Sequence, residues 1–374
     1  MRFLVLFLAA TASAQSLHLQ NSHSTENLRG VSPVSRQIAW ASGTHGTYLR
    51  TTDGGHTWTP AQVPDAASLD FRAVVAFSAN EAFLMSAGPG EQSRVYHTVD
   101  AGGHWQLQFT NTDPKGFFDS MAFWDHSHGV VLGDPIPDDS GKLKFELLLT
   151  EDGGEHWVPI ASSRLPEALP GEGAFAASNS CIAILPSPRI PETPWKSGAS
   201  APRQPGENNG ALAPDDPDPN IWFATGGAAA RVFHTPDRGK TWQVFETPVL
   251  HGPESAGIFS IAFRNDRDGV IAGGDYRRPK LDGPNLAFTH DGGKTWEIAN
   301  VHPQAYFSAV AYRERQTPRL FILGPDFVYD FRAAKVARQL RVQKGKTIVF
   351  NAVLPFPEGG VLLVGVKGAI AVIP

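Results

Sequence analysis

Short runs of alternating apolar residues recur along this chain, and turn-forming residues follow each of them. One kind of run appears as FRAVVAF (71–77), FFDSMAF (117–123), GAFAAS (173–178), IFSIAF (258–263) and YFSAVAY (306–312). Alternation of this kind over a short stretch predicts half-buried β-strands rather than helices. We therefore expect an all-β protein that is built from many short strands.

A second apolar run follows the first and ends close to a glycine. Its copies are IAWASGTHG (38–46), AFLMSAGPG (82–90), GVVLGDP (129–135), IWFATGG (221–227), GVIAGGD (269–275), LFILGPD (320–326) and VLLVGVKG (361–368). Seven copies of one strand predict seven repeats of one sheet unit. The 37 Gly and 30 Pro residues agree with a fold that has many turns.

A third repeat is the octapeptide TTDGGHTW at 51–58, which returns as TVDAGGHW (98–105), TEDGGEHW (150–157), TPDRGKTW (235–242) and THDGGKTW (289–296). Its Asp falls at 53, 100, 152, 237 and 291, so the steps are 47, 52, 85 and 54 residues. A period of about 50 residues with β-type composition is typical of propeller blades. The long step contains residues 186–220, where nine of 35 positions are proline, and we interpret this stretch as an insertion within blade four.

The sequence thus predicts a single seven-bladed β-propeller over residues 15–374, with four-stranded antiparallel blades. The octapeptide would form the turn between the third and fourth strands, with its Asp bound to backbone amides and its Trp buried. Blades six and seven lack it. Blade seven has room for only three strands, so we expect SLHLQ (16–20) to supply the fourth strand and close the ring.

The first residues, MRFLVLFLAATASA, have the pattern of a signal peptide, with one Arg, a short apolar run and a small-residue cleavage site. We expect residues 1–14 to be removed, leaving an exported periplasmic or secreted chain with no integral membrane segment. Cys181 is the single cysteine and lies in the apolar run SNSCIAIL, which predicts a buried, unreactive thiol without a disulfide.

The charge pattern argues against several partners and cofactors. Net charge is −5, from 32 basic and 37 acidic residues, and no long run of one sign occurs, so nucleic-acid binding is not expected. No stretch has the spacing of a zinc site, a dinucleotide fingerprint or a haem motif. We expect no cofactor, no metal and a monomer.

The octapeptide resembles the Asp box of bacterial neuraminidase repeats, with full matches at 51–58, 235–242 and 289–296. The copies at 98–105 and 150–157 depart from it at the seventh position, with His104 and His156 in place of Thr. In Asp-box families the motif is structural, which here implies that role for Asp53, Trp58, Asp100, Trp105, Asp152, Trp157, Asp237, Trp242, Asp291 and Trp296. The whole mature chain resembles the photosystem II stability/assembly factor family, which implies a propeller that helps to assemble a membrane protein complex.

Ligand-binding residues are expected at the end of the ring opposite the octapeptides, which we call face one. There the first strands begin and the second strands end around the central channel. The candidate binding residues are Arg29, Arg72, Asp119, Asp134, Glu172, Asp275 and Tyr276. His45, Glu91, Arg277, Arg278 and Lys280 lie at the same end.

Two functions compete at this point. The first is a non-catalytic scaffold that binds a protein or peptide partner in the cell envelope. The alternative is a sialidase-like glycoside hydrolase, in which Asp119 would work with Glu172 or Asp134 as acid and base if they lay about 5–9 Å apart. A redox enzyme has no supporting motif.

Overall fold

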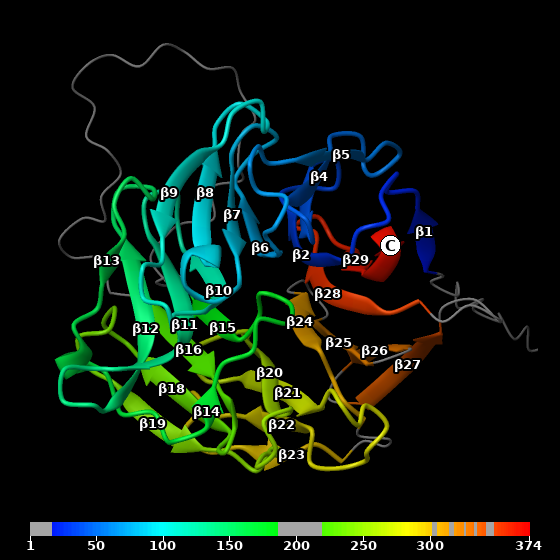
Figure 1. The fold of residues 1–374 in the computed structure, drawn as a ribbon. Coiled ribbons are helices and arrows are strands. Elements are labelled where there is room, and N and C mark those ends of the chain that lie inside the picture. Colours follow the sequence, from blue (N-terminus) through cyan, green and yellow to red (C-terminus); the bar gives the residue numbers. More distant parts are fainter. Residues whose placement is uncertain are drawn as a thin grey trace, which may run out of the picture.

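The computed structural model describes residues 17–185, 219–300, 305–313, 318–324, 327–332, 335–341 and 348–374. The strands form seven antiparallel sheets arranged as a ring, which confirms the predicted seven-bladed propeller (Figure 1). The predicted signal peptide, 1–14, and residues 186–218 of the predicted insertion lie outside the described residues. Within the described ranges, no helix is both long and apolar enough to cross a membrane.

The first three blades follow one plan, in which consecutive strands run from the channel outward. Blade one consists of β2 (Leu28–Pro33), β3 (Ala39–Gly43), β4 (Thr47–Thr51) and β5 (Thr59–Gln62). Blade two consists of β6 (Phe71–Ala76), β7 (Ala82–Ser86), β8 (Arg94–Thr98) and β9 (Gln106–Thr110), with the 3-10 turn η1 (Gly90–Gln92). Blade three consists of β10 (Phe118–Phe123), β11 (Gly129–Pro137), β12 (Leu143–Thr150) and β13 (Val158–Pro159), followed by η2 (Ser162–Arg164).

Blades four to six continue the ring. Blade four consists of β15 (Ile182–Leu185), β16 (Asn220–Ala224), β18 (Arg231–Thr235) and β19 (Gln243–Glu246). Blade five consists of β20 (Ala256–Phe263), β21 (Gly269–Asp275), β22 (Leu286–Thr289) and β23 (Glu297–Ile298), and its inner edge is extended by β17 (Gly226–Gly227) and β14 (Glu172–Gly173). Blade six consists of β24 (Ala309–Arg313), β25 (Arg319–Leu323), β26 (Phe327–Arg332) and β27 (Lys335–Arg341).

Blade seven joins the two ends of the described chain. It consists of β28 (Phe350–Pro355), β29 (Val361–Gly365), β30 (Ile370–Ile373) and β1 (His18–Gln20), with η3 (Val366–Gly368) between β29 and β30. The register pairs Leu19 with Ala371, so the predicted ring closure is confirmed. This pairing also explains why blade seven has no octapeptide, because its third and fourth strands are not joined by a turn.

The hydrophobic core is divided among the seams between neighbouring blades. Seven buried clusters each combine side chains from two adjacent blades. In each Asp box the Trp packs against the preceding blade: Trp58 on blade seven, Trp105 on blade one, Trp157 on blade two, Trp242 on blade three and Trp296 on blade four. The box therefore fixes a turn within one blade and fastens that blade to its neighbour.

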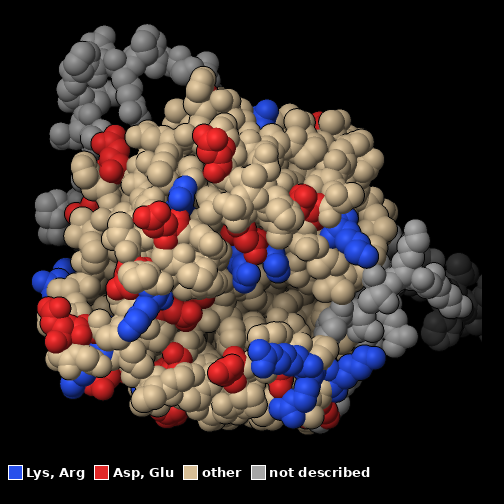
Figure 2. All heavy atoms as spheres, in the orientation of Figure 1, with Lys and Arg blue, Asp and Glu red and all other residues tan. Residues whose placement is uncertain are grey.

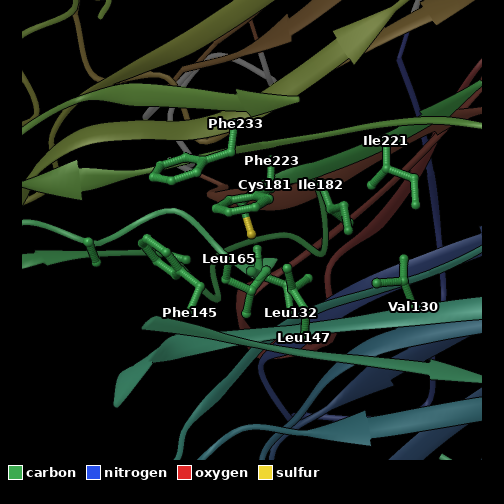
Figure 3. Close-up of a cluster of buried hydrophobic side chains, with 12 residues drawn as sticks. Val130, Leu132, Phe145, Leu147, Leu165, Cys181, Ile182, Ile221, Phe223 and Phe233 are labelled. Carbon is green, nitrogen blue, oxygen red and sulfur yellow. The ribbon is translucent and has the colours of Figure 1, made fainter. Parts of the chain in front are cut away.

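Cys181 lies in the seam between blades three and four, where its sulfur is surrounded by aromatic and aliphatic side chains (Figure 3). The residue is fully buried, and this burial raises the pKa of its thiol far above the ordinary value. The prediction of a buried thiol is confirmed, and the thiol stays in its unreactive protonated form.

The first strand of blade four does not lie where its sequence pattern placed it. We expected it at residues 173–178, but the strand is β15, at Ile182–Leu185. Burial does alternate along 174–178, as the pattern indicated. However, backbone amides of this stretch bind carboxylates from blade three, so the alternation reflects packing in the channel and not a sheet.

Candidate functional site

The innermost strands carry a repeated irregularity at face one. In five blades the register of the first strand shifts by one residue near its start, at the second residue in four blades and at the fourth residue of β20; such a shift is a β-bulge. The bulged residues are Arg29, Arg72, Asp119, Phe259 and Asn351. A bulge redirects the side chain of its extra residue. Because the first strands of neighbouring blades touch around the ring, these residues surround the entrance of the channel, which we call the mouth.

Two arginines share one carboxylate on the blade one and blade two side of the mouth. Arg72 Nε lies 2.9 Å from Asp70 Oδ2, and Arg29 Nη2 lies 3.5 Å from the same oxygen. Each arginine side chain is 27% exposed, so both can still reach a ligand. Burial lowers the pKa of Arg29, whereas Asp70 raises it. One carboxylate against two guanidinium groups leaves a net positive charge at this side.

Residues 174–178 cross the mouth, and we call this stretch the strap. Its Ala174 N–H donates to Asp134 Oδ1 at 2.9 Å, and its Ala176 carbonyl accepts from Arg72 Nη1 at 2.8 Å. Ser178 Oγ donates to the Ser308 carbonyl at 3.0 Å. The strap thus binds side chains or backbone of blades two, three and six, and it covers part of the channel.

Aromatic side chains form another side of the mouth. The Phe175 ring of the strap stacks on Phe259 with 3.9 Å between centroids. Tyr306 and Tyr276 each meet Phe259 edge to face, with centroids at 4.9 and 6.1 Å. Tyr276 is 46% exposed, so this aromatic surface is accessible from face one. It offers a place for an apolar side chain of a ligand.

The loop after β21 adds basic groups beside the aromatic residues. Arg277, Arg278 and Lys280 are exposed there. Asp275 is 2% exposed, accepts from Arg278 Nε at 2.7 Å and caps the Arg277 backbone N–H. In Figure 2, charged side chains surround a hollow near the centre of the ring, with basic groups prominent along its rim. The mouth therefore combines positive charge with aromatic surface.

Several predicted site residues are buried in the structure. The Glu172 side chain has no exposed surface, because it forms a buried ion pair with Arg231 and accepts from Thr225 Oγ1 at 2.6 Å. Asp119 is 1% exposed beneath the strap. Because both side chains are buried, Asp119 and Glu172 are not accessible to a glycan as the acid–base pair expected for a glycoside hydrolase. Arg29, Arg72 and Tyr276 are the predicted residues with clear access.

Two carboxyl groups of blade three, those of Asp119 and Asp134, have raised pKa values. Burial raises the pKa of Asp134 to about 6, although the Ala174 N–H lowers it. Burial also raises the pKa of Asp119 well above its ordinary range; Asp134 and Glu146 add to this, while Arg72 and Ala176 oppose it. Asp119 Oδ2 is buried and has no hydrogen-bond partner among the described residues. Burial therefore favours the neutral form of the Asp119 carboxyl group.

The raised pKa of Asp134 predicts that stability falls as pH rises from about 4 to about 6. Between the unfolded value of 3.8 and about 6, folded Asp134 holds a proton that the unfolded chain has lost. The contribution of Asp134 to the free energy of unfolding should be largest below this window and drop across it by up to about 3 kcal/mol. Urea unfolding over a pH series should show a smaller drop for Asp134→Asn, whereas exposed Asp139→Asn should match the wild type. An unchanged slope in Asp134→Asn would contradict this assignment.

The remaining predicted face-one residues contact local partners and not the residues of the mouth. Exposed His45 binds Glu26 Oε2 at 2.7 Å through Nδ1, and the Glu91 carbonyl accepts from Arg94 Nε at 2.6 Å. Sequence reasoning missed Asp70, Phe175, Phe259, Tyr306 and Asn351. Phe259 and Asn351 could have been found, because they occupy in their strands the position that Arg72 holds in FRAVVAF.

The Asp boxes lie at the opposite end of the blades. In every box the Thr hydroxyl donates to an Asp oxygen, a Gly N–H donates to that hydroxyl, and the N–H of the seventh residue donates to the Asp. In the box of blade two, His104 Nδ1 lies 2.6 Å from Asp100 Oδ2. In the box of blade four the equivalent contact is made by Thr241 Oγ1, which donates to Asp237 Oδ2 at 2.6 Å. The imidazole therefore replaces the hydroxyl, which explains the departures at His104 and His156.

Two further features complete the surface. Among the described residues, the one group spaced to hold a metal ion is Asp152, Glu155 and His156, which lies exposed in an Asp box. Beside the strap, a cleft of about 450 Å³ is lined by Lys115, Asp134, Leu143, Phe175 and Glu254, among others. This cleft extends the mouth toward the β11–β12 hairpin and gives a ligand room beyond the arginines.

Comparisons with known proteins agree with this architecture. The sequence profile of the family described as Photosynthesis system II assembly factor YCF48 matches residues 9–117. The chain is 22% identical over 309 residues to the photosystem II stability/assembly factor HCF136 of Arabidopsis thaliana, covering 76% of this chain and 70% of that protein. It is 24% identical over 267 residues to the photosystem II assembly lipoprotein Ycf48 of Synechococcus sp. (strain CC9902), covering 68% and 69%.

Solved structures support the fold. A structure titled YCF48 bound to D1 peptide matches with a TM-score of 0.62 and 16% identity, covering 96% of each chain. A structure of U3-55K matches with a TM-score of 0.61 and 11% identity, covering 96% of this chain and 99% of that one. The second match shows that the propeller fold alone does not fix a function. The chain is thus a β-propeller whose sequence is similar to photosystem II assembly factors.

Proposed function

We propose that this protein is a non-catalytic binding propeller that holds an acidic segment of a partner protein at the mouth on face one. The observation that carries the proposal is the pair Arg29 and Arg72, which share the single carboxylate of Asp70 and remain partly exposed. Partly desolvated guanidinium groups bind carboxylates through short, charge-assisted hydrogen bonds. The adjacent aromatic side chains would receive an apolar residue of the same segment.

The relatives support a protein partner. Two are named photosystem II assembly factors, and one related structure is described as bound to a D1 peptide. For this chain the partner is defined only by the chemistry of the mouth. The signal-like pattern of residues 1–14 supports export, so we place the protein in the periplasm or outside the cell, as a monomer that meets its partner in the envelope.

A titration with acidic peptide tests this proposal. The labelled probe Ac-GDEFDG-amide should bind wild type, and more weakly as salt is added, whereas Ac-GNQFNG-amide should not. Arg29→Glu/Arg72→Glu should weaken binding by about 30-fold or more, because it replaces attraction by repulsion. Fluorescence anisotropy measures the dissociation constants of the probe for wild type and for the variant, and unfolding by urea checks that the variant is folded. Equal binding of the probe by wild type and the folded variant would overturn the proposal.

A further inference from the structure

A second groove lies at the seam between blades two and three and shares no lining residue with the cleft beside the strap. It has a volume of about 390 Å³ and is bordered by β9 of blade two and by β11, β12 and β13 of blade three, which run side by side in Figure 1. We call it the seam groove. Its volume is in the range of about 300–1,000 Å³ that is typical of ligand pockets.

The floor of the seam groove is apolar. It is formed by Phe109, Ile136, Phe145, Leu147, Ile160 and Leu165. Phe109, Ile136 and Ile160 are only partly buried, so their surfaces are available from outside. Both outer strands, β9 and β13, pair on one side only among the described strands. An extended segment could therefore lie along this seam and place apolar side chains on the floor.

The rim of the groove is acidic. Its charged lining residues are Asp113, Asp138, Asp139, Glu146 and Lys144. The lysine is already engaged, because its Nζ donates to the Leu165 carbonyl at 2.7 Å. Burial raises the pKa of Glu146, and the carboxylates of Asp113 and Asp134 raise it further, which indicates a negative potential at the groove. A cationic partner would relieve this potential.

We propose that the seam groove docks a basic, apolar segment of a partner protein, with its aliphatic or aromatic side chains on the floor and its Lys or Arg side chains on the rim. This is opposite in charge preference to the mouth, which is positive. The two sites therefore select different segments, and one chain could hold an acidic segment at the mouth and a basic segment at the seam. The seam groove does not depend on the function proposed for the mouth.

The test compares three labelled peptides by fluorescence anisotropy: Ac-GKLFKG-amide, its acidic counterpart Ac-GELFEG-amide and its polar counterpart Ac-GKSSKG-amide. The protein variant is Asp138→Asn/Asp139→Lys, in which Asn keeps the acceptor that caps the Ser140 and Lys142 amides. The matched control is Glu246→Gln/Glu297→Lys, which changes the net charge equally at exposed outer-strand positions of blades four and five. A third variant, Ile136→Thr, makes the floor more polar.

The proposal predicts binding of the basic apolar peptide alone. Its affinity should fall by about tenfold or more in Asp138→Asn/Asp139→Lys, fall in Ile136→Thr, and stay unchanged in the control. Equal loss in the control would mean attraction to overall charge and would overturn the proposal, as would binding of GKSSKG as tight as that of GKLFKG. No binding of the basic apolar peptide would also overturn it. A concentration-dependent dimer that the groove variant abolishes would replace the proposed partner by a second copy of this chain.

Discussion

Replacing Arg231 by methionine should destabilise the protein by about 3–5 kcal/mol, because it leaves the Glu172 carboxylate buried without its counter-charge. Arg231 Nε donates to Glu172 Oε1 at 3.0 Å, and Arg231 Nη2 donates to Glu172 Oε2 and to the Glu167 carbonyl. Glu172 has no exposed side-chain surface, so water cannot replace the guanidinium. Urea unfolding at neutral pH measures the loss.

A double variant separates the buried charge from packing. Arg231→Met/Glu172→Gln removes both charges but keeps an acceptor for the Leu169 N–H, which now donates to Glu172 Oε2 at 2.8 Å. It should recover a large part of the lost stability. Because Glu172 begins the segment that leads into the strap, the single variant should also loosen the strap and weaken peptide binding at the mouth. A single variant as stable as the wild type would contradict this view of the pair.

Trp58→Ala should lower the free energy of unfolding by about 3–5 kcal/mol, because the indole fills the seam between blades one and seven, where the propeller closes. Trp58 is 1% exposed and packs among residues of blades one and seven. Its Nε1 donates to Gln20 Oε1 at 2.9 Å, and Gln20 Nε2 donates to the Gly54 carbonyl at 3.0 Å. One side chain thus connects the Asp box of blade one with the closing strand β1.

A milder change isolates the hydrogen bond of that tryptophan. Trp58→Phe keeps most of the buried surface and removes the donor to Gln20, so it should cost about 1 kcal/mol. Val99→Ala, at a residue that is 68% exposed in the box of blade two, should leave stability unchanged. Thermal and urea unfolding of the three variants give the ranking. A loss in Trp58→Ala no larger than in Val99→Ala would contradict a structural role for this box.

The fold was predictable because its signals are local and repeated. Two strand patterns and an octapeptide recur along the chain, so the blade count followed from seven copies of one strand and the closing strand from the missing fourth strand of blade seven. Blade four was the exception, since the apolar alternation of 173–178 serves contacts with Arg72 and Ser308, which lie 104 and 130 residues away from the residues they bind. No local pattern reports contacts between such distant residues.

The candidate site was predictable in position but not in detail. Topology placed Arg29, Arg72 and Asp119 around the channel, and the bulges lie at these residues. Whether a charged side chain is free or paired depends on its partner across the fold, as for Glu172 and Arg231. The aromatic side of the mouth was not predicted from the sequence, because a Phe in an apolar strand, such as Phe259, has the pattern of an ordinary core residue.

Photo-cross-linking in an envelope extract tests the central claim most directly. A photoreactive amino acid replaces Tyr276 at the mouth in one protein and Val99 at the Asp-box end in another; these side chains are 46% and 68% exposed. We expect a discrete partner adduct from position 276, its loss when Arg29→Glu/Arg72→Glu is added, and none from position 99. An adduct from position 99 alone, or one from 276 that survives the arginine changes, would contradict binding at the mouth.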